Sequence, residues 1–137
     1  MAKLTVDFKQ LEEMSRHLEH AGGDLKKVTE TALEETFNLV TPQLKSTIKP
    51  HHLTGATEGS LRTTAQVRWE GMTAYVPVGF DISHGGLASI FLMYGTPKMS
   101  PDKKLYNAIY GSATRKKVRD AQKKVFSDAI VKLYQGV

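Results

Sequence analysis

The sequence has no cysteine among its 137 residues. The chain can therefore form neither a disulfide framework nor a thiolate metal site, and we expect it to be made and used in a cytosolic compartment. Long apolar runs are missing too: no stretch approaches the roughly eighteen residues of a membrane span, and the first residues lack a signal-peptide core. These absences argue against a secreted, disulfide-rich protein and against a membrane-spanning one.

Catalytic motifs are equally scarce. The sequence has no Gly-x-Ser-x-Gly, no phosphate-loop pattern, no His-Glu-x-x-His and no calcium loop. The acid pairs Glu12-Glu13 and Glu34-Glu35 fall on helix faces that we expect to be exposed, where general acid or base chemistry is disfavoured. We therefore expect no catalytic residues, no cofactor and no enzymatic activity.

The five histidines are the remaining candidates for a metal site. Glu13, His17 and His20 are spaced to share one helix face, but exposed histidines on helices are far commoner than metal ligands. The other three histidines lie in expected loops, at positions His51, His52 and His84. We predict no metal site.

Length and composition favour one globular domain. A chain of 137 residues is too short for two independent cores, and its 40% hydrophobic and 24% charged residues are typical of soluble domains.

Helical periodicity marks the first third of the chain. Apolar residues spaced by three and four predict a helix over residues 7–20, which Asp7 would cap, and Gly22-Gly23 would end it. Asp24 would cap a second, longer helix over residues 24–48. Its apolar stripe comprises Leu25, Val28, Ala32, Leu33, Phe37, Val40, Leu44 and Ile48. Pro42 lies inside this stripe and predicts a kink or a break.

The middle of the chain changes to loop and strand patterns. Prolines and glycines predict a loop over residues 49–60. Strict alternation of apolar and polar residues then predicts a β-hairpin over residues 61–80, with a turn at Glu70-Gly71. Pro77 indicates that the second strand is an edge strand or bulges. A hairpin alone is marginally stable, so helices must cover its apolar face.

The last third begins with a short apolar segment at residues 87–94, whose periodicity does not distinguish strand from helix. Ser100 followed by Pro101 predicts the start of a C-terminal helix over about residues 101–134, with a possible interruption at Gly111-Ser112. We therefore predict an α+β fold, in which a small antiparallel sheet built on the central hairpin packs against a long N-terminal helix, preceded by a shorter one, and a long C-terminal helix.

Charge is distributed unevenly. Residues 7–35 contain eight acids and four bases, whereas residues 98–124 contain nine bases and two acids. The asymmetry has three interpretations: a basic surface for nucleic acid, complementary faces that meet within or between subunits, or ordinary solvated helix faces. The six bases within residues 115–124 could contact the phosphates of a nucleic acid. A protein that binds single strands or specific sequences usually also has aromatic side chains that stack on bases. Tyr106 and Tyr110 lie nearby, but they are equally suited to helix packing.

The order of short motifs resembles the small tail-component or neck proteins of long-tailed bacteriophages. The resemblance covers residues 8 to about 133 and is carried by Thr41-Pro42, Thr54-Gly55 followed by Ser60-Leu61, Val78-Gly79, Tyr94-Gly95-Thr96 and Leu105-Tyr106-Asn107-Ala108. The sequence departs from the family pattern by an insertion from Ala56 to Ser60, by Met93 in place of an acid, and by Lys104 in place of phenylalanine.

The resemblance implies a virion structural protein at the head–tail junction, assembled in the host cytoplasm. Such a subunit would form a homo-oligomeric ring and contact the head-completion or connector proteins and the tail-terminator or tail-tube proteins. Genomic DNA would pass nearby without sequence-specific binding, and no membrane would be involved. The alternative is a basic accessory protein that binds nucleic acid.

Two groups of residues are the candidate contacts in such a ring. Acidic and basic helix faces could pair between neighbouring subunits, because heterologous contacts that close by rotation give rings. The candidate subunit contacts are Glu30, Glu34, Glu35, Arg115, Lys116, Lys117 and Arg119. The loop is a candidate docking arm that orders on binding. Its candidate residues are Pro50, His51, His52, Thr54 and Gly55.

Overall fold

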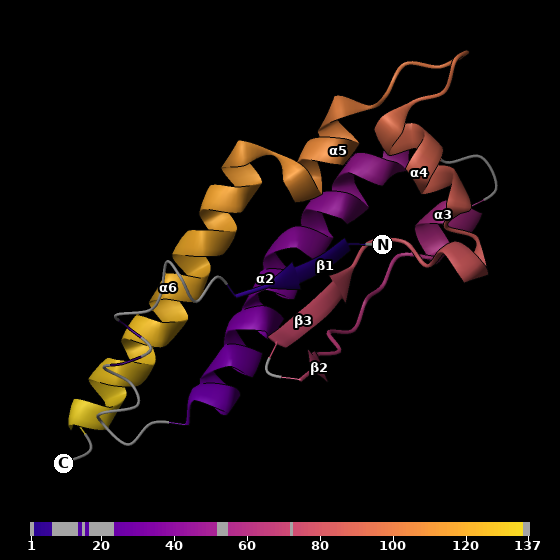
Figure 1. The fold of residues 1–137 in the computed structure, drawn as a ribbon. Helices are drawn as coiled ribbons and strands as arrows, with labels where there is room; N and C mark the ends of the chain where they lie inside the picture. The colour runs from indigo at the N-terminus through magenta and orange to yellow at the C-terminus, as the bar shows by residue number, and fades with distance from the viewer. Residues whose placement is uncertain are drawn as a thin grey trace.

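The structure, a computed structural model, describes residues 2–6, 14, 16, 24–51, 55–71 and 73–135. These residues form an α+β domain with a three-stranded antiparallel sheet and two long helices, as predicted (Figure 1). The helix predicted over residues 7–20 lies outside the described residues, apart from Met14 and Arg16, which are helical.

The long helix α2 (Leu25–Ile48) has the predicted bounds. The Asp24 carboxylate caps it by accepting a hydrogen bond from the Lys27 backbone N–H at 3.1 Å. Its buried residues recur at helical spacing and are Thr29, Ala32, Leu33, Thr36, Phe37, Val40, Leu44 and Ile48. The helix continues through Pro42, so the predicted break is wrong. Pro42 is exposed and lacks the backbone N–H that would donate to the Asn38 carbonyl, so the helix is without this hydrogen bond.

The sheet has the order β1-β3-β2, formed by β1 (Ala2–Thr5), β2 (Arg68–Glu70) and β3 (Thr73–Val78). The predicted hairpin over residues 61–80 is present as β2 and β3, but its first strand is much shorter than predicted. A single bridge between Leu61 and Phe80 continues the pairing beyond an irregular stretch at residues 62–67. Strand β1 was not predicted, because its four residues are too few for a periodic signal.

Pro77 explains why the pairing between β2 and β3 is short. β3 is the central strand, so the prediction of an edge strand is wrong: β1 pairs with it on one side, with Lys3 opposite Pro77. On the other side, β2 pairs with β3 only as far as Tyr75, two residues before Pro77. Proline has no N–H to donate, which accounts for the interrupted pairing on that side.

The predicted loop at residues 49–60 contains two helical turns, η1 (Lys49–His51) and α3 (Ala56–Gly59), so the expectation of a loop throughout is wrong. After β3 come the turn η2 (Ile82–His84) and α4 (Leu87–Tyr94), which shows that the short apolar segment is helical.

The predicted C-terminal helix is two helices, α5 (Lys103–Tyr110) and α6 (Ser112–Gln135), with the interruption at Gly111. Ser100 was predicted as its cap, but the helix begins later. The Asp102 carboxylate is the cap and accepts hydrogen bonds from the backbone N–H groups of Lys104 at 2.9 Å and Leu105 at 3.2 Å. A carboxylate that satisfies two free donors and carries a negative charge at a helix N-terminus is a strong start signal.

Helix α2 lies between the sheet and α6 (Figure 1). The contacts of Thr36 with Gln122 and of Gln43 with Thr114 show that α6 runs antiparallel to α2. The core between these layers is built from side chains of α2, β3, α5 and α6, among them Leu33, Val40, Leu44, Val76, Val78, Leu105 and Phe126. In the described part of the chain, no helix is both long enough and apolar enough to span a membrane.

Candidate assembly surface

The four predicted basic contact residues lie together near the start of α6. Arg115, Lys116, Lys117 and Arg119 are all exposed, while Val118 between them is half-buried. Within the part of the chain that the structure describes, no ion pair involves any of these four side chains. Their charges are therefore available to a partner.

Two of the three predicted acids are similarly placed. Glu34 and Glu35 are exposed on α2, and neither forms an ion pair with another described residue. Because α6 runs antiparallel with Gln122 beside Thr36, residues 123–124 lie level with these acids in the same subunit. The surface of α2 and α6 thus offers unpaired charges of both signs.

Glu30 has a partner inside the subunit. Its Oε1 accepts a hydrogen bond from the Trp69 indole N–H at 3.1 Å, and Lys26 Nζ lies 5.6 Å from the centre of the same ring. These contacts fasten β2 to α2. Glu30 is therefore a structural link within the subunit, a role that sequence reasoning missed.

The predicted docking loop is partly fixed to the rest of the domain. His51 Nε2 lies 2.5 Å from the Asp102 carboxylate, and this pair ties the end of α2 to the start of α5. Pro50 is exposed on η1, and Gly55 adopts a left-handed φ of 82° before α3. The other two predicted loop residues, His52 and Thr54, lie outside the described residues.

An exposed apolar face on α4 was not predicted as a contact. Leu87, Phe91 and Tyr94 are 51%, 47% and 59% exposed, and their spacing of four and three places them on one side of the helix. Ile82 before the helix and Met99 after it are each 40% exposed. The one sequence signal was that residues 87–94 are apolar throughout, which implies a helix covered on all sides.

The inner side of α4 is firmly anchored. Met93 and Ser89 are buried, and the Ser89 hydroxyl donates to the Gly86 carbonyl at 2.6 Å. Glycine is required at position 86, because a Cβ there would lie 2.6 Å from the Asp81 carbonyl oxygen. The Asp102 N–H donates to the Leu92 carbonyl at 2.7 Å and joins the end of α4 to the start of α5.

Three tyrosines connect α4 to α5. The Tyr94 and Tyr106 rings meet edge to face with their centres 5.7 Å apart, and the Tyr106 and Tyr110 rings lie 5.0 Å apart. Burial, together with a hydrogen bond to Tyr94, raises the pKa of the Tyr110 phenol. Tyr106 and Tyr110 are therefore engaged in helix packing, one of the two roles that the sequence left open.

Unpaired lysines surround the α4 end of the molecule. Their side chains are exposed and form no ion pair with other described residues, and they belong to Lys49, Lys98, Lys103 and Lys104. The acids here are already engaged: Asp102 with His51, and Asp81 with His84 and Arg62. This end thus carries an excess of unpaired positive charge, although Lys104 lies in the groove between α2 and α5 and not beside α4.

A serine, a histidine and an aspartate cluster at η2, but their geometry is not that of a catalytic triad. Asp81 Oδ1 accepts from the Ser83 hydroxyl at 2.7 Å, and Asp81 Oδ2 lies 2.9 Å from His84 Nδ1. Both contacts, the one with Ser83 first, lower the pKa of Asp81. In a triad the histidine lies between the other two, with one ring nitrogen on the carboxylate and the other on the serine hydroxyl. Here the hydroxyl donates directly to the carboxylate, and the same His84 Nδ1 lies 3.2 Å from the hydroxyl and 2.9 Å from the carboxylate. The cluster shapes the turn.

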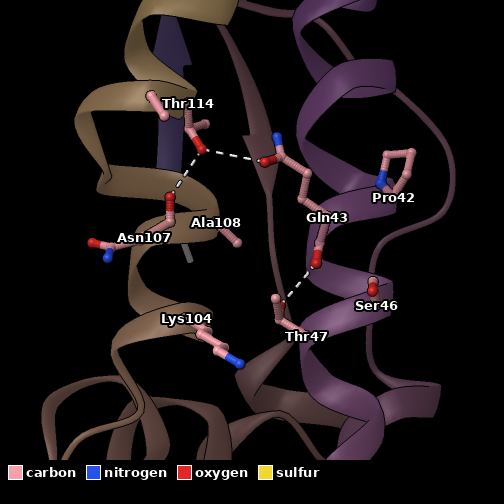
Figure 2. Close-up of a pocket in the computed structure, with 9 residues that line it drawn as sticks. Pro42, Gln43, Ser46, Thr47, Lys104, Asn107, Ala108 and Thr114 are labelled. Atoms are coloured by element: carbon pink, nitrogen blue, oxygen red, sulfur yellow. Dashed lines mark hydrogen bonds between the residues drawn. The ribbon is translucent and has the colours of Figure 1, made fainter.

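A surface groove of about 560 Å³ separates α2 from α5 and the start of α6 (Figure 2). The Thr114 hydroxyl lies 2.9 Å from the Asn107 carbonyl and 3.4 Å from Gln43 Oε1, and the Thr47 hydroxyl donates to the Gln43 carbonyl at 2.8 Å. These polar groups bond to one another across and along the groove. Among the described residues, no cluster of three or more histidines and acids could hold a metal ion.

Comparison with known proteins adds no relative: no known family, no curated protein and no solved structure matches the chain.

Proposed function

We propose that the protein is a structural subunit of the head–tail interface of a long-tailed phage, which assembles into a ring that joins the capsid connector to the tail. The order of sequence motifs supports this assignment. The observation that carries it is the exposure of Glu34 and Glu35 on α2 and of the four bases on α6 without ion-pair partners in the described part of the chain. A subunit with unpaired charges of both signs is suited to bind copies of itself.

Charge complementarity sets the geometry of such an assembly. In this proposal, the four bases near the start of α6 meet the acidic N-terminal third of a neighbouring subunit, residues 7–35, which carries a net charge of −4. The two surfaces differ, so the contact is heterologous and the growing assembly keeps one free surface of each kind, at its two ends, until the ring closes. Electrostatic attraction of this type fixes orientation and accelerates association.

The test is the mass of the purified protein in solution, together with negative-stain images, alone and with the adjoining head and tail proteins. Reversal of the four bases (Arg115→Glu, Lys116→Glu, Lys117→Glu, Arg119→Glu) is expected to abolish ring formation. The matched control reverses four bases outside both surfaces (Lys3→Glu, Lys45→Glu, Arg68→Glu, Lys132→Glu) and should leave rings intact at the same net charge. A wild-type protein that stays monomeric under all these conditions contradicts the proposal, as does a four-base variant that still forms rings.

The alternative function, nucleic-acid binding, has one observation in its favour. The six bases within residues 115–124 are all exposed on α6. Because Tyr106 and Tyr110 are engaged in packing, binding through this helix would rely on phosphate contacts and would show little sequence preference. Fluorescence anisotropy with a short DNA duplex measures it. A monomeric wild type whose affinity for the duplex falls steeply with salt would favour this function over the ring.

A further inference from the structure

The apolar face of α4, defined by Leu87, Phe91 and Tyr94, is unusual for a surface helix. Its opposite side already contributes Met93 to the core, so α4 is apolar both inward and outward. Five of the six large hydrophobic residues that are exposed in the described part of the chain belong to this face or flank it. Contiguous exposed apolar surface of this kind marks an interaction site.

We propose that the α4 face is the apolar centre of the contact between copies of this chain, and that it docks on the α2 surface of a neighbour that carries Glu34 and Glu35. This inference rests on the proposed function, since it names the surface through which one ring subunit binds the next. Aromatic and aliphatic side chains at the centre, with charged residues at the rim, are the usual anatomy of a protein interface.

The charges around α4 select the partner. Lys98 in the loop after α4 and Lys103 at the start of α5 form no ion pair with other described residues, while Asp81 and Asp102 are bound within the subunit. Two α4 faces placed against each other would bring these lysines together, which disfavours a symmetric pairing. An acidic surface is required instead, and Glu34 and Glu35 are exposed acids without an ion-pair partner in the part of the chain that the structure describes.

The position of the two surfaces fits a head-to-tail contact. α4 lies at the end of the molecule where α2 terminates (Figure 1). Glu35 is thirteen residues before the end of α2 at Ile48, a rise of about 20 Å along the helix axis. Two different surfaces separated in this way on one subunit generate a ring or a filament, and not a closed symmetric dimer.

The deciding experiment exchanges charges between the two surfaces and measures assembly by sedimentation velocity. Lys98→Glu with Lys103→Glu is expected to weaken self-association at least tenfold, and so is Glu34→Lys with Glu35→Lys. The variant that combines all four changes is expected to recover most of the wild-type assembly. Position 98 is exposed in the loop before α5, and position 103 lies in the first turn of α5, where negative charge favours a helix, so loss of folding does not confound the result.

A second arm tests the apolar centre. Leu87→Ser with Phe91→Ser is expected to abolish assembly, whereas Ala88→Ser, an exposed position on the same helix, should leave it unchanged. Circular dichroism and the melting temperature verify that each variant is folded. Assembly that persists in the Leu87→Ser, Phe91→Ser variant would overturn the inference.

Other outcomes separate this inference from the function on which it rests. Recovery of the Glu34→Lys, Glu35→Lys variant by Arg115→Glu with Lys116→Glu, and not by Lys98→Glu with Lys103→Glu, would show that these acids face α6. In that case the ring would stand and the inference would fail. A monomeric wild type would refute both. Co-sedimentation with phosphatidylglycerol vesicles that depends on Leu87 and Phe91, in variants whose assembly is unaffected, would assign the face to a lipid surface and overturn the inference.

Discussion

The side-chain amide of Gln122 on α6 donates a hydrogen bond to the Thr36 hydroxyl of α2 at 2.9 Å, although both side chains are buried. The same Nε2 group also donates to the Thr5 carbonyl at the end of β1, 3.2 Å away. Thr36 in turn donates to the Ala32 carbonyl, so both buried side chains have hydrogen-bond partners. One side chain thus joins the sheet and both long helices.

Replacement of Gln122 by leucine should destabilise the domain by about 2 kcal/mol, because it removes the donor that the Thr5 carbonyl and the buried Thr36 hydroxyl share. Urea unfolding followed by circular dichroism measures this change. The control is Lys123→Leu, which changes the exposed residue next to it and should cost less than about 0.5 kcal/mol. Equal stabilities for the two variants would mean that the buried amide contributes nothing.

Glu30 and Trp69 make the link between α2 and β2 measurable, because Trp69 is the one tryptophan of the chain. Glu30→Ala should shift the tryptophan emission to longer wavelength, since β2 would be held less firmly and its indole would meet more water. Glu30→Gln keeps an oxygen acceptor for the indole N–H and should retain an emission close to that of the wild type. An unchanged spectrum in Glu30→Ala would contradict the link. Glu34→Ala, on the exposed side of α2, serves as the control.

The sequence predicted those elements whose apolar residues recur at a regular spacing. Helix α2 follows from a stripe of eight apolar residues and its Asp24 cap, and the turn between β2 and β3 follows from alternation on both sides of it. Strand β1 was not predictable, because four residues are too few to show a period and the strand is defined by its pairing with β3, about seventy residues away. The start of α5 was misplaced because Ser100-Pro101 and Asp102 are both plausible caps, and only the geometry selects between them.

The charged residues of the candidate assembly surface could be predicted from the sequence, but the exposed apolar residues of α4 could not. Exposed bases and acids on helices can be read from the spacing of the apolar stripe, which places Glu34 and Arg115 outside. Apart from Ser89, the residues of α4 are apolar or aromatic on every side, so the pattern does not reveal which of them face the core and which face outward. The internal role of Glu30 was likewise hidden, because its partner Trp69 lies 39 residues away.

Pro42 stands inside α2, is exposed, and costs the helix one backbone hydrogen bond. Pro42→Ala should therefore raise the free energy of unfolding by about 1–2 kcal/mol, the helical gain less the added freedom of the unfolded chain. Thermal and urea unfolding measure it. As a control, Ser46→Ala changes an exposed residue one turn later and should have a much smaller effect. A less stable Pro42→Ala variant would show that the proline ring contributes a contact that outweighs the missing bond.

The pair formed by His51 and Asp102 should make stability depend on acid pH. The hydrogen bond from His51 is the main cause that lowers the pKa of the Asp102 carboxyl, with further hydrogen bonds from the Leu105 and Lys104 N–H groups. A carboxyl whose pKa is lower in the folded than in the unfolded state stabilises the fold above its unfolded pKa, about 4 for aspartate. That contribution disappears as pH falls through the lower folded pKa, because the folded carboxyl then becomes protonated as well.

We therefore expect His51→Ala to reduce the free energy of unfolding by about 1 kcal/mol at about pH 6, with the difference from the wild type shrinking towards about pH 2. The side chains of the pair are 27% and 24% exposed, so solvent screening keeps the effect this small. Asp102→Asn retains an oxygen that can cap α5 but removes the charge, and His51→Ala added to it should cause little further loss. Urea unfolding at closely spaced pH values across this range supplies the comparison. Additive losses in the double variant, or a difference that is constant over this range, would show that the two residues stabilise the junction of α2 and α5 independently.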